Sequence, residues 1–227
     1  LFRLGKYDEA LEYYRRFTHL CPENHSGYIL QGNTLINLAR PEEAIAAYRQ
    51  AESKIGNNES DIIEIFQELA LTLSSIGKKE EALEYVKKAE NYPFSDKNET
   101  KVLRGHIYLE HDCLPEAQAC FRAAIHGSDF SRRIFLYIAM SAFDCGYINI
   151  AYKMFKAAPS FRADTDKKGL SYLALCCHQL DKKKEFLENL KKACDEEADE
   201  ARNVLGFLFP RELDVNEYYN YMYNKLK

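Results

Sequence analysis

The sequence has 227 residues, of which 46% are hydrophobic, enough to bury the core of one or two ordinary domains. Its 31 basic and 35 acidic residues leave a net charge of −4, which argues against a nucleic acid or an anionic membrane surface as the main partner, because both need a basic excess. No apolar run approaches the roughly 20 residues of a membrane-spanning helix.

The seven cysteines are odd in number, and no two of them form a C-x-x-C pair. Most lie in segments with a helical apolar pattern, where cysteine behaves as a small hydrophobic residue. We therefore expect a reducing location, the cytoplasm, rather than a compartment that builds disulfides. The sequence starts at Leu1, in the middle of the repeating pattern described next, so we expect further residues before it. A signal peptide that has been removed is an alternative.

A pattern of small residues repeats along the chain. One column starts at Ala10 and returns at spacings of 34, 38, 35, 34 and 35 residues, at Ala44, Ala82, Ala117, Ala151 and Phe186. A second small residue precedes the last five of these by twelve positions: Gly32, Ala70, Gly105, Ala139 and Ala174. Length changes, as in residues 55–61, fall between copies and not within them. The pattern therefore predicts a helix pair joined by a short turn of fixed length.

Each copy should bring two antiparallel helices together at its small residues, because a close crossing needs Gly or Ala. The residues between the two helices suit a helix stop: Gly5, Gly77, Gly146, Asp112 and Asp181. Acidic pairs that complement the helix dipole open several second helices: Asp8-Glu9, Glu42-Glu43 and Glu80-Glu81. Since one pair cannot bury its own apolar face, the pairs are expected to stack.

The segment "GNTLINLARPEEAIAAYRQA" (residues 32–51) resembles the tetratricopeptide repeat in the spacing of its small, alanine and bulky positions. The resemblance implies an all-α fold, an α-solenoid of stacked antiparallel helix pairs in a right-handed superhelix. It divides the chain into a partial repeat (1–24), five repeats (25–62, 63–97, 98–131, 132–166 and 167–200) and C-terminal capping helices (201–227). Phe186 departs from the pattern, and we expect wider helix spacing there because overpacking costs about 1–3 kcal/mol.

In this family the first helix of each pair lines the concave side of the superhelix. In the first helix of the second copy, Tyr28, Gly32 and Leu35 form the stripe that packs against other helices. The other faces of this helix are not part of that stripe. The matching positions along the chain are the candidate peptide-binding residues: Ile29, Asn33, Asn37, Gln67, Leu71, Val102, His106, Arg133, Leu136, Met140, Lys168 and Leu175. For the aliphatic members the alternative is packing against neighbouring first helices, whereas polar side chains there gain little from packing.

The candidate surface changes in charge along the chain. It is acidic and amide-rich in the first half, and apolar with Arg133 and Lys168 in the second. A partner with an apolar anchor and with opposite charges toward its two ends would complement it. A carboxylate clamp, which some members of the family use to bind chaperone tails, is disfavoured because only Asn33 or Lys168 matches its positions.

Nothing in the sequence points to catalysis. Common motifs such as G-x-x-x-x-G-K, G-x-G-x-x-G, H-E-x-x-H and G-x-S-x-G are absent. His106 and His111 are five residues apart, not the four that would put two ligands on one helix face, and "CCH" at 176–178 points to three different faces. We therefore expect no enzymatic activity, no metal and no cofactor.

The C-terminal segment does not follow the repeat. Pro210 should end a helix begun near Ala198, and Asp214 with Glu217 resembles a capping box that opens a last helix. This helix is expected to cover the open end of the stack. Self-association through its tyrosine-rich side is the alternative.

The sequence thus predicts a non-catalytic scaffold that binds a protein or peptide of unknown identity, and neither nucleic acid nor membrane. A first alternative is a structural or oligomerisation module of a longer protein whose activity lies upstream. A second is an RNA-binding helical repeat, which Glu64 and Glu99 disfavour because such proteins need basic grooves.

Overall fold

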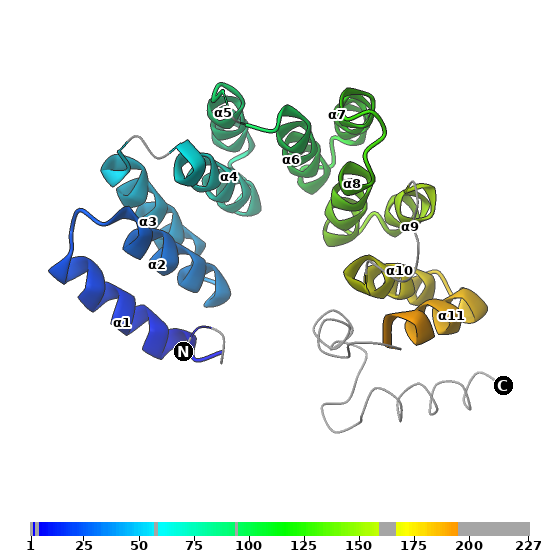
Figure 1. The fold of residues 1–227 in the computed structure, drawn as a ribbon, viewed down its shortest axis with the longest axis horizontal. Coiled ribbons are helices and arrows are strands. Elements are labelled where there is room, and N and C mark those ends of the chain that lie inside the picture. The colour runs from blue at the N-terminus through cyan, green and yellow to red at the C-terminus, as the bar shows by residue number, and fades with distance from the viewer. Residues whose placement is uncertain (1, 3–4, 57–58, 94, 159–166, 195–227) are drawn as a thin grey trace. The chain divides into compact units, whose positions relative to one another are not determined.

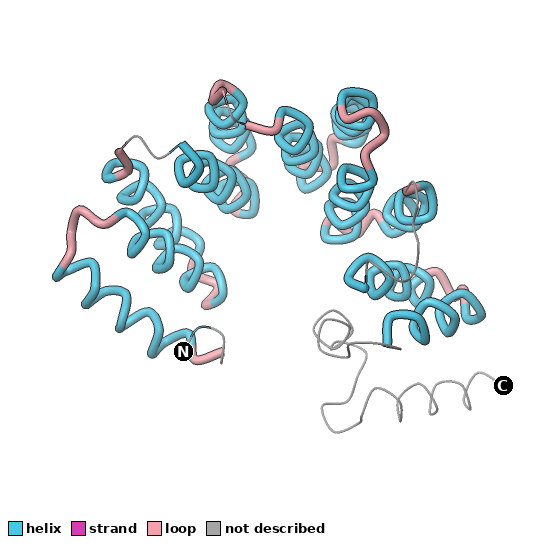
Figure 2. Tube along the Cα trace, in the orientation of Figure 1, coloured by secondary structure: helices cyan, strands magenta, loops and turns pink. Residues whose placement is uncertain are grey.

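The computed structural model describes residues 2, 5–56, 59–93, 95–158 and 167–194. These residues form eleven α-helices and no strand (Figures 1 and 2). The helices are α1 (Tyr7–Leu20), α2 (His25–Asn37), α3 (Pro41–Lys54), α4 (Glu59–Ser75), α5 (Lys79–Glu90), α6 (Lys97–Glu110), α7 (Leu114–Gly127), α8 (Arg132–Asp144), α9 (Ile148–Ala157), α10 (Lys167–Gln179) and α11 (Lys183–Cys194).

The chain divides into two compact units, residues 1–120 and 121–227. In the first unit α2 packs against α3 and α4 against α5, and the pairs stack through contacts of α1 with α2, α3 with α4, and α5 with α6. In the second unit α8 pairs with α9 and α10 with α11, and α10 also contacts α8 and α9. The predicted all-α fold of stacked antiparallel helix pairs is confirmed in each unit.

The small residues of the repeat lie where helices cross. The alanine column of the second helices is fully buried: Ala44, Ala82, Ala117 and Ala151. Gly32 of α2 lies against the ring of Tyr48 of α3, and a Cβ added at Gly32 would collide with that ring. The close approach of α2 and α3 therefore depends on the missing side chain, because packed interiors leave no room to absorb one.

The turns that follow first helices share one backbone conformation in the described residues. Each has one residue at positive φ: Gly5 (70°), Ala39 (55°), Gly77 (82°), Asp112 (56°), Gly146 (79°) and Asp181 (53°). In the five turns from Ala39 onward, the next amide donates to the carbonyl five residues back, as from Arg40 N to Leu35 O at 2.9 Å. This bond closes the helix C-terminus, so the helix stops predicted at Gly77, Asp112, Gly146 and Asp181 are confirmed, whereas the helix expected before Gly5 lies outside the described residues. Ala39 joins the column although its residue type gave no signal.

The predicted acidic pairs lie in the first turns of α1, α3 and α5. In α3 and α5, one acid of the pair also contacts the preceding second helix. Arg15 Nη2 lies 3.4 Å from Glu43 Oε2, and Arg49 Nη2 lies 3.2 Å from Glu81 Oε2. These exposed ion pairs link successive second helices, and each contributes little alone because water screens it.

Some expectations stay predictions. The C-terminal segment 201–227, with the capping helix and its self-association, lies outside the described residues. Phe186 is buried and its ring centroid lies 5.3 Å from that of His178, but the wider spacing predicted around it is untested, as are the limits of the individual repeats. None of the described helices is long and apolar enough to span a membrane.

Candidate functional site

The first helices of the first unit differ in how far they expose the predicted binding residues. Four of the side chains are half-buried: Asn33, Gln67, Leu71 and His106. Asn37 is exposed, and its Nδ2 donates to the main-chain oxygen of Asn33 at 2.8 Å. Ile29 and Val102 keep only 8% and 5% of their surface. These two side chains therefore offer little area to a ligand, as the packing alternative describes.

Asn33 belongs to a hydrogen-bonded group that joins three helices. The Tyr48 hydroxyl of α3 donates to Asn33 Oδ1 of α2 at 2.6 Å, and Glu68 of α4 is a second partner of the same hydroxyl. Burial and the neighbouring Glu68 raise the pKa of Tyr48 far above its usual value, so the hydroxyl stays protonated. Burial, and then the charge of Glu64, also raise the pKa of the Glu68 carboxyl.

His106 of α6 lies in a second polar group. Its Nε2 is 3.5 Å from Glu110 Oε1, and Ser74 Oγ of α4 donates to the Glu110 carboxylate and lies 3.4 Å from His111 Nε2. Burial alone would raise the pKa of Glu110, but the hydrogen bonds from His106 and Ser74 outweigh it and the pKa is lowered. The group ties α4 to α6 and holds the His106 ring at the end of the candidate surface.

In the second unit the candidate face follows α8. Leu136 and Met140 are half-buried, and Arg133 is exposed with its guanidinium carbon 5.8 Å from the ring centroid of Tyr137. Tyr137 keeps 39% of its surface, although the sequence analysis did not select it. Its spacing of four residues from Arg133 could have found it, since such residues share a helix face.

Two other predicted residues lie on α10. Leu175 is 7% exposed and packs rather than facing solvent. The side chain of Lys168 lies outside the described part of the structure. The candidate face of the second unit therefore depends on α8.

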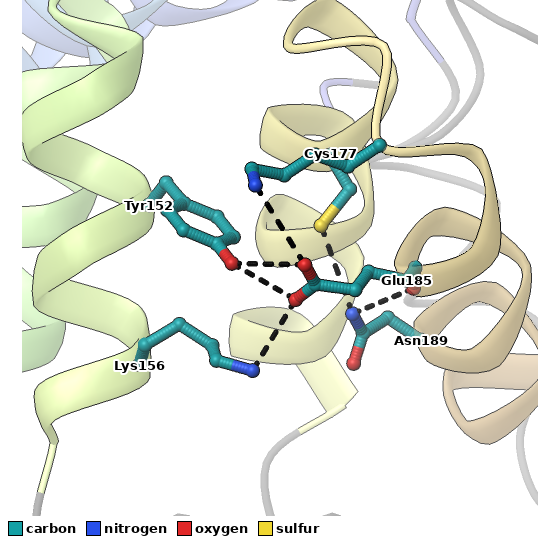
Figure 3. Close-up of polar contacts among 6 residues, drawn as sticks. Tyr152, Lys156, Cys177, Glu185 and Asn189 are labelled. Atoms are coloured by element: carbon teal, nitrogen blue, oxygen red, sulfur yellow. Dashed lines mark hydrogen bonds and ion pairs between the residues drawn. The ribbon is translucent and has the colours of Figure 1, made fainter.

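A polar cluster that the sequence analysis missed joins α9 to α10 and α11 (Figure 3). The Tyr152 hydroxyl donates to Glu185 Oε2 at 2.9 Å, Lys156 Nζ lies 3.3 Å from the same oxygen, and Asn189 Nδ2 lies 3.8 Å from Cys177 Sγ. Burial and the bond to Glu185 raise the pKa of Tyr152 to about 12. Lys156 and Glu185 occupy the repeat positions of Arg49 and Glu81, so the cluster contains, within the second unit, the same kind of ion pair between second helices.

The cysteines of the "CCH" segment are buried and unreactive in character. Cys176 and Cys177 have no exposed surface, and burial raises the pKa of Cys177 to about 11, which keeps its thiol protonated near neutral pH. Across the described residues, no three His, Cys, Asp or Glu side chains converge as a metal site would need. His178 is exposed on α10.

Several solved structures share this arrangement of helices, whereas no curated protein matches the sequence. TTC0263, a TPR protein of Thermus thermophilus, has a TM-score of 0.55 at 16% identity, covering 88% of this chain and 100% of that one. PilW, a type IV pilus biogenesis factor, has a TM-score of 0.54 at 18% identity, covering 90% and 93%. Cut9-Hcn1, an APC/C hetero-tetramer, has a TM-score of 0.54 at 10% identity over 96% of this chain, which spans 46% of that one.

At these identities the structures show a common fold and nothing further. Family profiles described as tetratricopeptide repeat match residues 1–59 and residues 63–93 of the sequence itself. The same residues carry the alanine column and the left-handed turns on which the stacked helix pairs depend. Residues 1–93 of the chain therefore belong to the tetratricopeptide-repeat family.

Proposed function

We propose that this chain is a non-catalytic scaffold that binds a protein or peptide through the candidate faces of its first helices. One observation supports the proposal most directly. Four first helices hold a partly exposed side chain at the same repeat position, namely Asn33, Leu71, His106 and Met140, whereas Leu175 at this position of α10 is buried. The small residue that precedes each of them by one position packs at the helix crossing. A surface that recurs at one position without being covered by the stack is available to a partner.

The family supports the same class of function, because tetratricopeptide repeats serve in protein interactions. Among the structural relatives, Cut9-Hcn1 is an assembly of protein chains. For this chain the partner and the use of the groove belong to the proposal. The mixture of amide, imidazole and apolar side chains suits an extended segment, whose main chain needs hydrogen bonds and whose side chains need pockets.

The two alternatives differ in what the first helices would carry. An RNA-binding repeat needs a basic groove, whereas α2 and α4 contain no Lys or Arg. A purely structural module would bind no partner through the half-exposed column, so substitutions there would leave every interaction intact.

Capture from the native lysate, compared between two matched variants, tests the proposal. The first variant carries Asn37→Ala, Arg133→Ala and Met140→Gln on the candidate faces. The control carries Gln50→Ala, Lys87→Ala and Lys153→Ala, which are exposed on second helices. We expect the first variant to lose specific partners that the control retains, with similar thermal melts. Equal capture by both variants would contradict the proposal.

We also infer that the protein resides in a reducing compartment, such as the cytoplasm. The support comes from the cysteines, since those described are free thiols and the adjacent Cys176 and Cys177 pack as small apolar side chains.

A further inference from the structure

Glu68 is a carboxylate at a repeat position that otherwise carries apolar or aromatic side chains. The equivalent residues of the other first helices are Leu30, Leu103, Tyr137 and Tyr172. At this position the Tyr172 ring packs edge-on against Phe143 at 5.2 Å between centroids, whereas Leu30 and Tyr137 are 40% and 39% exposed. Glu68 is half-buried at this position, where α4 carries a carboxyl group in place of an apolar or aromatic side chain.

Glu68 lies on an acidic stretch of α4, although α3, α5 and α6, which contact α4, carry Lys and Arg. Neither α2 nor α4 contains Lys or Arg, whereas α4 carries Glu59, Asp61, Glu64 and Glu68. Asp61 Oδ2 is paired with His25 Nε2 at 2.8 Å. In the part of the chain that the structure describes, Glu64 and Glu68 form no ion pair with Lys or Arg. We call the surface of Asn33, Glu64, Glu68 and Leu71 the α2–α4 face, and it carries two acidic side chains and no Lys or Arg.

The partners of Glu68 inside the protein are neutral. Its carboxylate meets the hydroxyl of Tyr48, which is itself anchored on Asn33. Burial, and then the Glu64 charge, raise the pKa of Glu68, so the folded protein disfavours the ionised form of this carboxyl. A cation brought by a partner would relieve this cost, because an opposite charge stabilises a carboxylate most where water is partly excluded.

An apolar surface lies on the same stripe of α4. Glu64, Glu68 and Leu71 are spaced i, i+4 and i+7, which places them in line along one helix face. Leu71 is half-buried and Glu64 is exposed. A long basic side chain suits such a stripe, since its aliphatic stem covers apolar surface while its charged end reaches the carboxylates.

We propose that the α2–α4 face binds a Lys or Arg side chain of an extended segment of a partner protein, with the cation between Glu64 and Glu68 and the stem on Leu71. The inference depends on the proposed peptide-binding function and names the chemistry of the segment that the first unit accepts. Because Asn33 Oδ1 accepts the bond from Tyr48, the Nδ2 donors of Asn33 would serve the main-chain carbonyls of the segment.

Three fluorescein-labelled octapeptides test the proposal: alternating Leu and Lys, alternating Leu and Gln, and alternating Leu and Glu. Fluorescence anisotropy should show the Lys peptide binding most tightly, with affinity that falls as salt is raised. Glu64→Gln and Glu68→Gln should each weaken it about fivefold, the factor that corresponds to about 1 kcal/mol. Glu84→Gln on α5, an equal change in charge at an exposed second-helix position, should leave it within about twofold.

The outcomes separate this inference from the function on which it rests. Equal weakening by Glu84→Gln would show non-specific attraction, and tight binding of the Glu peptide would show the wrong charge; either result overturns the inference. If the Gln and Lys peptides bind equally and both lose affinity in the Asn37, Arg133 and Met140 variant, the inference fails while the groove function stands. Absence of binding by the Lys peptide also overturns the inference, and the lysate experiment then decides the function alone. Thermal melts exclude misfolding of Glu68→Gln if its melting temperature equals or exceeds that of the wild type.

Discussion

Replacing Ala39 with Gly should stabilise the first unit. Ala39 has φ = 55° in the turn between α2 and α3, where three equivalent turns use Gly. The left-handed conformation costs a residue with a Cβ roughly 1–2 kcal/mol, and Gly loses about 0.5–1 kcal/mol more in conformational entropy on folding. The difference predicts a gain of about 0.5–1 kcal/mol in the free energy of unfolding. The bonds of the turn, such as Arg40 N to Leu35 O at 2.9 Å, are between main-chain atoms and do not change.

Urea unfolding followed by far-UV circular dichroism measures this gain as a higher midpoint at constant slope. Gly77→Ala is the matched reverse change, because Gly77 has φ = 82° and the following Lys78 N donates to Leu73 O at 2.9 Å. It should lose a similar amount. If Ala39→Gly leaves the midpoint unchanged or lowers it, or Gly77→Ala costs nothing, backbone conformation does not select the residues of the turn column.

Three further predictions concern packing, pH and reactivity. Gly32→Ala should lower the free energy of unfolding by about 1–3 kcal/mol in urea titrations, because the added Cβ meets the Tyr48 ring. Glu68→Gln should raise the free energy of unfolding at pH 7, because burial raises the pKa of the Glu68 carboxyl and its ionised form therefore opposes folding. In unfolding curves this gain should shrink as the pH falls toward 4.5, since the wild-type carboxyl then becomes protonated. A thiol reagent should label the exposed Cys21 in the native protein, and Cys177 only after unfolding, as mass spectrometry of the labelled peptides can establish.

The part of the fold that depends on residue size could be predicted from the sequence. Gly32 and Ala44 mark a helix crossing because no larger side chain fits between the helices. For this reason small residues recur at the crossing positions along the sequence. The turn positions could be predicted only where the residue was Gly or Asp, because these residues adopt the left-handed conformation at low cost. Ala39 was missed because hydrogen bonds within the turn impose the conformation on a residue that does not favour it.

The candidate site was harder to predict because exposure depends on neighbouring helices. A helical wheel selects a face, but Ile29 and Val102 lie on the selected face and are buried by packing that the wheel does not contain. The bond from Tyr48 to Asn33 joins residues of different helices, and its pairing with Glu68 brings in a third. No spacing within one repeat encodes this group.

Photo-crosslinking from single positions tests the central claim most directly. A benzophenone amino acid is placed at Met140 on the candidate face of α8, or at Lys153, which is exposed on the second helix α9. In the native lysate we expect crosslinks to a discrete partner from position 140 and none from position 153. Crosslinks that come only from position 153, or equally from both, would contradict the claim that partners bind the first helices.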